Sequence, residues 1–310
     1  MLSWCDPHAF SSGTEGLKFS CSVAKRSSLS TALQSFLSIS AELKQVAARS
    51  TNLLVDKTQS STQQNGSTRE GGIRACKNLG RSDAIEVSMN QNPQKLPMGG
   101  VRDDRYIPYK LAPDLEGGQK VLDMLCGAGF DARAAPTFDW IHDTFLVIIR
   151  MFPRCVPIPT TLVSMNGRYD PHFHVKLGAA LRPLRYENTL IIGSGGSVHN
   201  LYRNHWEHMF RFNDNFAQPV PPDPWALQFR QAVEDSITCN TGPALRRALS
   251  RLMKHPRYRD AHGTDDHWMA SLFVAGAAGG VDDTGPNTMM GECWELVNMC
   301  NTQCQLGSWD

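Results

Sequence analysis

The chain has 310 residues, enough for one large α/β domain or two ordinary ones, and 41% of them are hydrophobic, so it can bury a sizeable core. Thirty-one Lys and Arg residues against thirty Asp and Glu residues leave a formal net charge of +1. This balance excludes a global field that would recruit nucleic acid or a membrane surface, so we expect a small-molecule or protein partner. The uncharged run near residues 269–281 is shorter than the roughly 20 residues that a membrane span needs.

Nine cysteines are scattered along the chain without a CxxC pair. Cys293, Cys300 and Cys304 lie close together, but no histidine pair at zinc-finger spacing accompanies them. The odd count and the absence of a secretory signal favour reduced thiols in a reducing compartment, so we expect a cytoplasmic protein.

Residues 1–82 differ in texture from the rest and are rich in Ser, Thr and Gln. Residues 57–72 (KTQSSTQQNGSTREGG) predict a disordered linker, and apolar spacing over residues 31–49 predicts one amphipathic helix. The basic, Ser-rich start is compatible with an organellar transit peptide, a solvated tail or a misassembled gene. We therefore divide the chain into a low-complexity, atypical segment, 1–82, and a globular domain, 83–310.

From residue 83 onward, short strands and helices alternate in the sequence. The predicted strands are 84–89, 160–165 and 189–192, and 144–151 is an apolar helix or strand. The predicted helices are 114–125, 171–185, 223–237, 242–254 and 264–278, the last with Thr264 as its N-cap. This alternation predicts an α/β sandwich of helices around a mixed or parallel central sheet.

A glycine-rich turn, TLIIGSGGSVH, follows the strand at 189–192. A dinucleotide fingerprint would need a third glycine where Val198 stands, and a Walker loop would need a lysine, so both phosphate-binding interpretations fail. The turn lies at the carboxyl end of a strand, where open α/β sheets bind ligands. His199 just beyond it is either a core or capping residue or a functional one.

Ten histidines are present, and only His8 precedes His142. Asp139 and Asp143 flank His142, and either carboxylate could orient a working imidazole; a helix-capping pair is the alternative.

Two other histidine pairs favour structural roles. His172 and His174 stand where a helix opens, and residues two apart on a helix do not share a face. His205 and His208 are three apart on a predicted helix, but their polar neighbours indicate a solvated face. We assign surface and packing roles to both pairs.

The segment HGTDDHWMASLFVAG gives a stronger signal. Asp265 and Asp266 fall in the first turn of the predicted helix, where the positive end of its dipole stabilises them without catalysis. His267 follows in the same turn, and its neutral imidazole could coordinate a metal. His262 is the more structural of the two histidines.

Taken in order, these segments resemble the class III extradiol ring-cleavage dioxygenases, in the branch similar to 4,5-DOPA extradiol dioxygenases. The resemblance runs from about residue 83 to near the C-terminus and includes AIEVSMNQNP, LEGGQKVLDML, FDWIHDTFLVIIRMFP, LGAALRPLR, LIIGSGGSVHNL and TDDHWMASLFVAGAAG. It implies that His199 is the acid/base residue, that His267 is one of three protein metal ligands, and that His142 contacts substrate or oxygen. It also implies Fe(II), or Zn(II) in some relatives, and cleavage of a catechol with O2. We expect His199 and His267 to converge on one cavity at the edge of the sheet.

The chain departs from this family at its N-terminus. The two further metal histidines, in S-H-G or G-H-G and A-H-W contexts, have no counterpart here. One metal ligand of three is too few for a catalytic site. Either residues 1–82 come from a misassembled or alternatively spliced transcript, or the chain is a diverged, inactive paralogue. Three hypotheses stay open: a metal-dependent dioxygenase, a metal-free or truncated binding protein, and a metal hydrolase in which His199 activates water.

Overall fold

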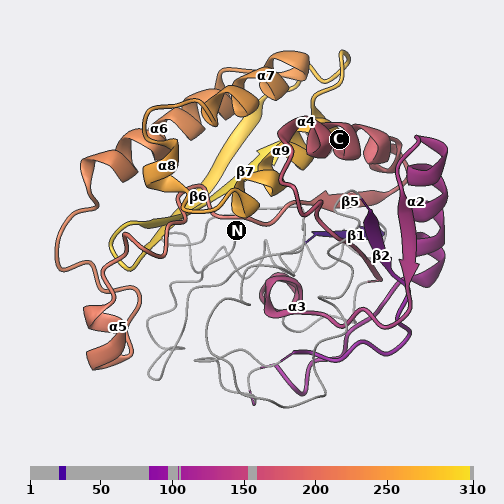
Figure 1. Cartoon of the computed structure of the whole chain (residues 1–310), viewed down its shortest axis with the longest axis horizontal. Coiled ribbons are helices and arrows are strands. Elements are labelled where there is room, and N and C mark those ends of the chain that lie inside the picture. Colours follow the sequence, from indigo (N-terminus) through magenta and orange to yellow (C-terminus); the bar gives the residue numbers. More distant parts are fainter. Residues whose placement is uncertain (1–20, 26–83, 97–103, 105, 153–158, 308–310) are drawn as a thin grey trace, which may run out of the picture.

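A computed structural model of the chain describes residues 21–25, 84–96, 104, 106–152 and 159–307. A five-stranded mixed sheet in the order β3-β2-β4-β1-β5 lies among helices, and a two-stranded hairpin, β6-β7, stands apart from it (Figure 1). The predicted α/β class with a mixed central sheet is therefore confirmed. The strands are β1 Cys21–Lys25, β2 Ile85–Ser88, β3 Ala132–Ala135, β4 Thr160–Val163, β5 Thr189–Ile192, β6 Asn287–Glu295 and β7 Met299–Leu306.

The predicted helices are present near their predicted ranges, except that 171–185 ends in a 3₁₀ turn, and the ambiguous apolar run at 144–151 is helical. The helices are α2 Leu115–Gly127, α3 His142–Met151, α4 Pro171–Leu181, the 3₁₀ turn η3 Arg182–Tyr186, α5 Glu207–Phe212, α6 Pro224–Thr238, α7 Gly242–Leu252, α8 Tyr258–Ala261 and α9 Asp266–Ala278. No range was predicted for α5 or α8. The prediction of Thr264 as the N-cap of α9 is wrong. Asp265 holds that position, and the Thr264 hydroxyl donates instead to the Asp266 carboxylate at 2.6 Å. None of the described helices is long and apolar enough to cross a membrane.

β1 is the one described element of the N-terminal segment, and it runs antiparallel to both of its neighbours. Cys21 pairs with Val163 of β4, and Ser22 pairs with Ile192 of β5. No strand was predicted within residues 1–82, yet this one lies between β4 and β5, the strand that leads to the glycine turn. The predicted helix at 31–49 and linker at 57–72 lie outside the described residues.

α9 is the central helix of the domain, and most of its side chains are buried on all sides because nearly every residue after Asp266 is apolar or small. It packs tightly against α4, where both helices present a glycine. A Cβ on Gly178 would lie 1.8 Å from the Phe273 carbonyl oxygen, and one on Gly276 would lie 2.1 Å from the Val175 carbonyl oxygen. Glycine therefore sets the distance between the two backbones and fixes the position of the N-terminal turn of α9.

Candidate active site: a buried histidine pair

The glycine turn after β5 is held from two sides. Val198 exchanges backbone hydrogen bonds with Cys300 of β7, at 3.2 and 3.0 Å, and the His199 amide donates to the Ala261 carbonyl at 2.8 Å. The turn also lies directly against α9, since a Cβ on Gly195 would be 2.0 Å from the His267 carbonyl oxygen. Small residues are thus required here so that the backbone can approach a helix, which explains the glycines without a phosphate ligand.

This packing brings His199 and His267 together. Their rings stack with centroids 3.5 Å apart and planes inclined by 20°. His199 is 5% exposed and His267 1% exposed, so the pair is buried. The two imidazoles therefore lie together, as expected, while the common cavity at the edge of the sheet stays a prediction.

The protonation state of His267 follows from one hydrogen bond. The Gly196 amide donates to its Nδ1 at 2.7 Å, so Nδ1 holds a lone pair and the neutral ring carries its proton on Nε2. Two stacked rings cannot both be cations at this separation in a buried site. Because the Gly196 amide opposes a proton at Nδ1, a proton taken up by the pair belongs on His199.

His262 contacts the segment that carries His199. Its backbone bridges to His199, and its Nε2–H donates to the Ser197 carbonyl at 3.0 Å. Its ring lies among Phe229, Tyr258 and Trp268 at centroid distances of 5.1 to 5.5 Å. This is the structural role expected for it. The ring ties the glycine turn to α8 and α9, a role that the spacing of histidines in the sequence does not reveal.

His142 lies on a different helix from His267 and far along the chain from His199. It is the half-buried first residue of α3, which in Figure 1 lies on the side of the sheet away from α4 and α9. His174 is buried and serves packing, with its Nδ1–H donating to the Asp170 carbonyl at 2.7 Å and its Nε2 accepting from the Asn166 amide at 3.2 Å. The structure thus joins two of the three predicted site histidines.

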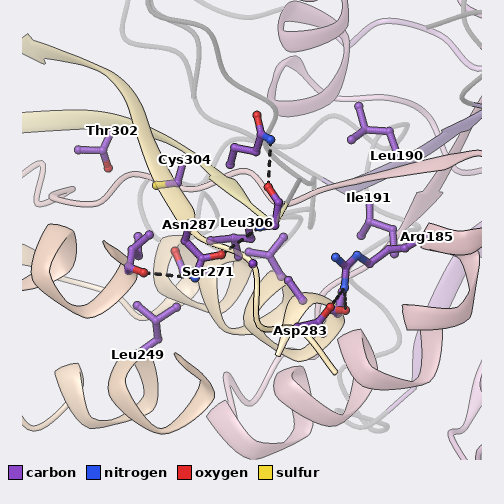
Figure 2. A pocket seen from close by; sticks show the side chains of 18 of the residues that line it. Arg185, Leu190, Ile191, Leu249, Ser271, Asp283, Asn287, Thr302, Cys304 and Leu306 are labelled. Atoms are coloured by element: carbon purple, nitrogen blue, oxygen red, sulfur yellow. Dashed lines mark hydrogen bonds and ion pairs between the residues drawn. The ribbon is translucent and has the colours of Figure 1, made fainter. Parts of the chain in front are cut away.

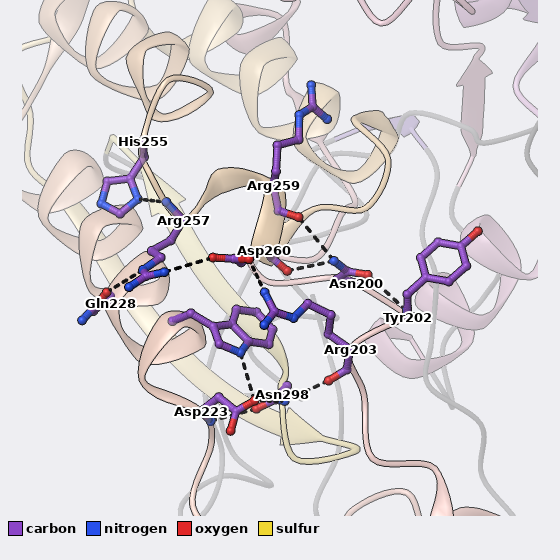
Figure 3. A network of polar contacts seen from close by, with 11 residues as sticks. Asn200, Tyr202, Arg203, Asp223, Gln228, His255, Arg257, Arg259, Asp260 and Asn298 are labelled. Atoms are coloured by element: carbon purple, nitrogen blue, oxygen red, sulfur yellow. Dashed lines mark hydrogen bonds and ion pairs between the residues drawn. The ribbon is translucent and has the colours of Figure 1, made fainter.

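Asn200 anchors the loop that carries His199 (Figure 3). Its side-chain amide donates to the carbonyls of Asp260 at 2.9 Å and Arg259 at 3.4 Å, and its Oδ1 accepts from the Tyr202 amide at 3.1 Å. Arg203 continues this network, because it pairs with Asp260 and stacks over Trp225 at 4.6 Å. No role was predicted for any of these residues from the sequence.

We expect Asn200→Ala to lower the free energy of unfolding by about 1–3 kcal/mol, because it leaves two carbonyls and one amide without their buried partner. Gln228→Ala is the matched control: Gln228 is exposed in the same network and only accepts from Arg257, so its loss should stay within about 0.5 kcal/mol. Urea denaturation measures both. Equal stabilities of the two variants would contradict the anchoring role.

Comparison with known proteins gives no matching family model. The chain is 28% identical to a 4,5-DOPA dioxygenase extradiol of Escherichia coli K12 over 205 residues, which are 66% of this chain and 69% of that protein. The protein of the same name from Beta vulgaris is 28% identical over 174 residues, 55% of this chain and 59% of that one. A 4,5-DOPA dioxygenase extradiol-like protein of Schizosaccharomyces pombe is 32% identical over 138 residues, 44% and 42% of the two chains.

This chain is related to the 4,5-DOPA extradiol dioxygenases. A crystal structure of an uncharacterized Escherichia coli K12 protein has the same fold, with a TM-score of 0.57 at 23% identity over 72% of this chain and 81% of that one. The match to the Beta vulgaris dioxygenase covers little more than half of that protein. The relatives' names indicate an oxygenase-like protein at the level of the family.

The resemblance to 4,5-DOPA extradiol dioxygenases implies Fe(II) or Zn(II), and the residues of this site can be compared with what such an ion needs. Among residues 21–25, 84–96, 104, 106–152 and 159–307, no group of three His, Cys, Asp or Glu side chains is arranged to hold a metal ion. His267 places a proton on Nε2 and accepts the Gly196 amide at Nδ1, so neither nitrogen offers a lone pair to a metal in this arrangement. The described residues therefore do not fit the Fe(II) or Zn(II) site that the resemblance implies.

Proposed function

We propose that this chain binds a catechol-type aromatic diol at the His199–His267 pair, and that His199 exchanges a proton with one of the diol's hydroxyl groups. Residues 83–310 form the domain that carries this site. Two facts support the proposal: the relatives carry the names of dioxygenases that act on DOPA, and two of the predicted site histidines stack at 3.5 Å. The stacking is the single observation that carries it.

The two imidazole rings have different roles in this proposal: His267 stays neutral and His199 accepts the proton. His267 stays neutral because the Gly196 amide occupies its Nδ1. His199 receives the diol's proton, and the cation that forms lies against a neutral ring face rather than against a second charge. A catecholate and a protonated His199 then form an ion pair at the end of β5.

Binding of 4-nitrocatechol tests this proposal, because the absorption of this diol shifts when it loses a proton. With chelator present, we expect the wild-type chain to bind it in the deprotonated form. His199→Ala should weaken binding by about tenfold or more and abolish the spectral shift, since a charge-assisted contact is lost. His172→Ala, at an exposed position of α4, is the matched control and should behave as wild type. An unchanged spectral shift in His199→Ala would overturn the assignment.

Ring cleavage of the bound catechol with Fe(II) and O2 is the second candidate function, and the names of the relatives favour it. The poor fit of the described residues to a metal favours binding without metal. Anaerobic addition of Fe(II), followed by iron analysis and exposure to O2, separates the two. Stoichiometric iron with a semialdehyde product supports the dioxygenase; diol binding without iron uptake supports the metal-free protein. His267→Ala should lose iron in the first case and leave the metal content unchanged in the second.

A further inference from the structure

A cavity of about 510 Å³ borders the glycine turn, with Gly193, Gly195 and Ser197 in its lining. Leu190 and Ile191 of β5 form one wall, Thr302 and Leu306 of the hairpin form the opposite wall, and Ser271 of α9 lies between them (Figure 2). Neither His199 nor His267 lines it. Its volume is within the range of small-molecule sites, roughly 300–1,000 Å³.

The cavity exists because β5 and β7 separate. The two segments meet at the Val198–Cys300 bridge, but β5 then pairs with β1 in the main sheet and β7 pairs with β6 in the hairpin. Residues of both strands line the space between them. Its apolar residues, among them Leu190, Ile191 and Leu306, can contact the body of an organic molecule, and its polar residues can contact a polar group.

Arg185 lies at one end of the cavity with its side chain 22% exposed. Its Nη1 donates to the Ala277 carbonyl at 3.0 Å and to Asp283 at 2.8 Å. Both contacts use the same nitrogen, and a guanidinium has five donors in a planar fork. Nη2 and Nε therefore remain for a planar, bidentate acceptor in the cavity, which is the geometry of a carboxylate.

Three guanidinium groups and two carboxylates meet at this end, and of these Arg185, Asp282 and Asp283 line the cavity. Arg182 and Arg185 both pair with Asp283, at 3.1 and 2.8 Å, while Asp282 is 81% exposed and 3.8 Å from Arg182, so solvent screens it. Arg246 lies nearby, and burial together with the charge of Arg182 lowers the pKa of its guanidinium. Asp283 and the carbonyl end of α9 neutralise only part of three guanidinium charges.

We propose that this cavity binds a small amphipathic carboxylic acid, with its apolar body between β5 and the hairpin and its carboxylate on Arg185. The site is distinct from the histidine pair and does not depend on the proposed diol binding.

Calorimetric titration with 2-naphthoate, and with 2-naphthamide as its neutral counterpart, tests the proposal on the full chain. The carboxylate should bind about tenfold more tightly than the amide. Arg185→Met should reduce naphthoate binding to the level of the amide. Arg133→Met is the matched control: Arg133 of β3 pairs with Asp131 at the opposite edge of the sheet from β5 and does not line the cavity, so binding should change less than about threefold.

Ser271→Phe provides a second, independent test because a larger side chain from α9 fills the cavity without removing a charge. It should abolish the binding of both compounds, and far-ultraviolet circular dichroism checks that the variant is folded. Equal affinities for naphthoate and naphthamide, or full naphthoate binding by Arg185→Met, would overturn the proposal, as would unimpaired binding by a folded Ser271→Phe.

Discussion

Replacing Gly178 by alanine is expected to lower the free energy of unfolding by about 2–3 kcal/mol, near the upper end for overpacked cores. The added Cβ would lie 1.8 Å from the carbonyl oxygen of Phe273 and 2.8 Å from its carbonyl carbon, so α4 and α9 must move apart. Backbone atoms cannot rotate away as a side chain could. Urea denaturation followed by circular dichroism measures the loss.

Gly127→Ala is the control for the Gly178 substitution. Gly127 is the last residue of α2, and a Cβ there meets nothing within 4 Å. Alanine should therefore leave stability unchanged or raise it by up to about 1 kcal/mol through its better helix propensity. If Gly178→Ala is as stable as Gly127→Ala, the close contact between α4 and α9 is wrong. Because α9 carries His267, Gly178→Ala should also weaken diol binding.

Two buried groups should give the chain opposite dependences of stability on pH. Burial lowers the pKa of His174 from 6.5 to about 4. Between these values the unfolded state binds the extra proton, so stability rises with pH through this window. Burial raises the pKa of Glu295 from 4.5 to about 7, against the opposing effect of hydrogen bonds from Asn215 and Asn301. Between these values the folded state binds the extra proton, so stability falls as pH rises.

Each effect amounts to about 3 kcal/mol, because one pKa unit corresponds to about 1.4 kcal/mol, and the two nearly cancel in wild type from pH 4.5 to 6.5. Glu295→Gln should therefore reveal a stability that rises by about 3 kcal/mol from pH 4 to 6.5. His174→Gln should reveal a fall of similar size from pH 4.5 to 7. Urea denaturation at half-unit steps of pH measures both slopes. His172→Gln, two residues away and exposed, should leave the wild-type profile intact, and parallel slopes in all three variants would contradict this interpretation.

Most of the helices were predicted because apolar spacing, or in α9 a continuous apolar run, ends at a clear stop. The strand β3 was missed because Ala132–Ala135 contains no β-branched or aromatic residue, and pairing with β2 alone makes it a strand. The hairpin β6-β7 was missed for another reason. Leu296 and Val297 adopt φ of 50° and 68° in its turn, where turn chemistry favours glycine or asparagine. Their burial, at 3% and 1% exposure, holds this conformation, and burial cannot be read from local sequence.

The histidine pair was predicted through resemblance, and its chemistry was not. The residues GSGGSVH do not predict that the Gly196 amide donates a hydrogen bond to Nδ1 of His267, which lies far along the sequence. That contact depends on how closely the glycine turn approaches α9. It decides which ring holds a proton, and it weighs against the metal-ligand role predicted for His267. The Arg185 cavity was also missed, since it arises from the divergence of two strands.

The position of β1 constrains the order in which this molecule can fold. β2 and β3 are close neighbours in sequence and can pair early, but β1 must find partners in β4 and β5, which lie far along the chain. Closing so large a loop carries an entropic cost before any strand contact repays it, so the centre of the sheet forms late. During synthesis, the edges of β4 and β5 stay open until that step and are the surfaces through which a nascent chain would aggregate or recruit a chaperone.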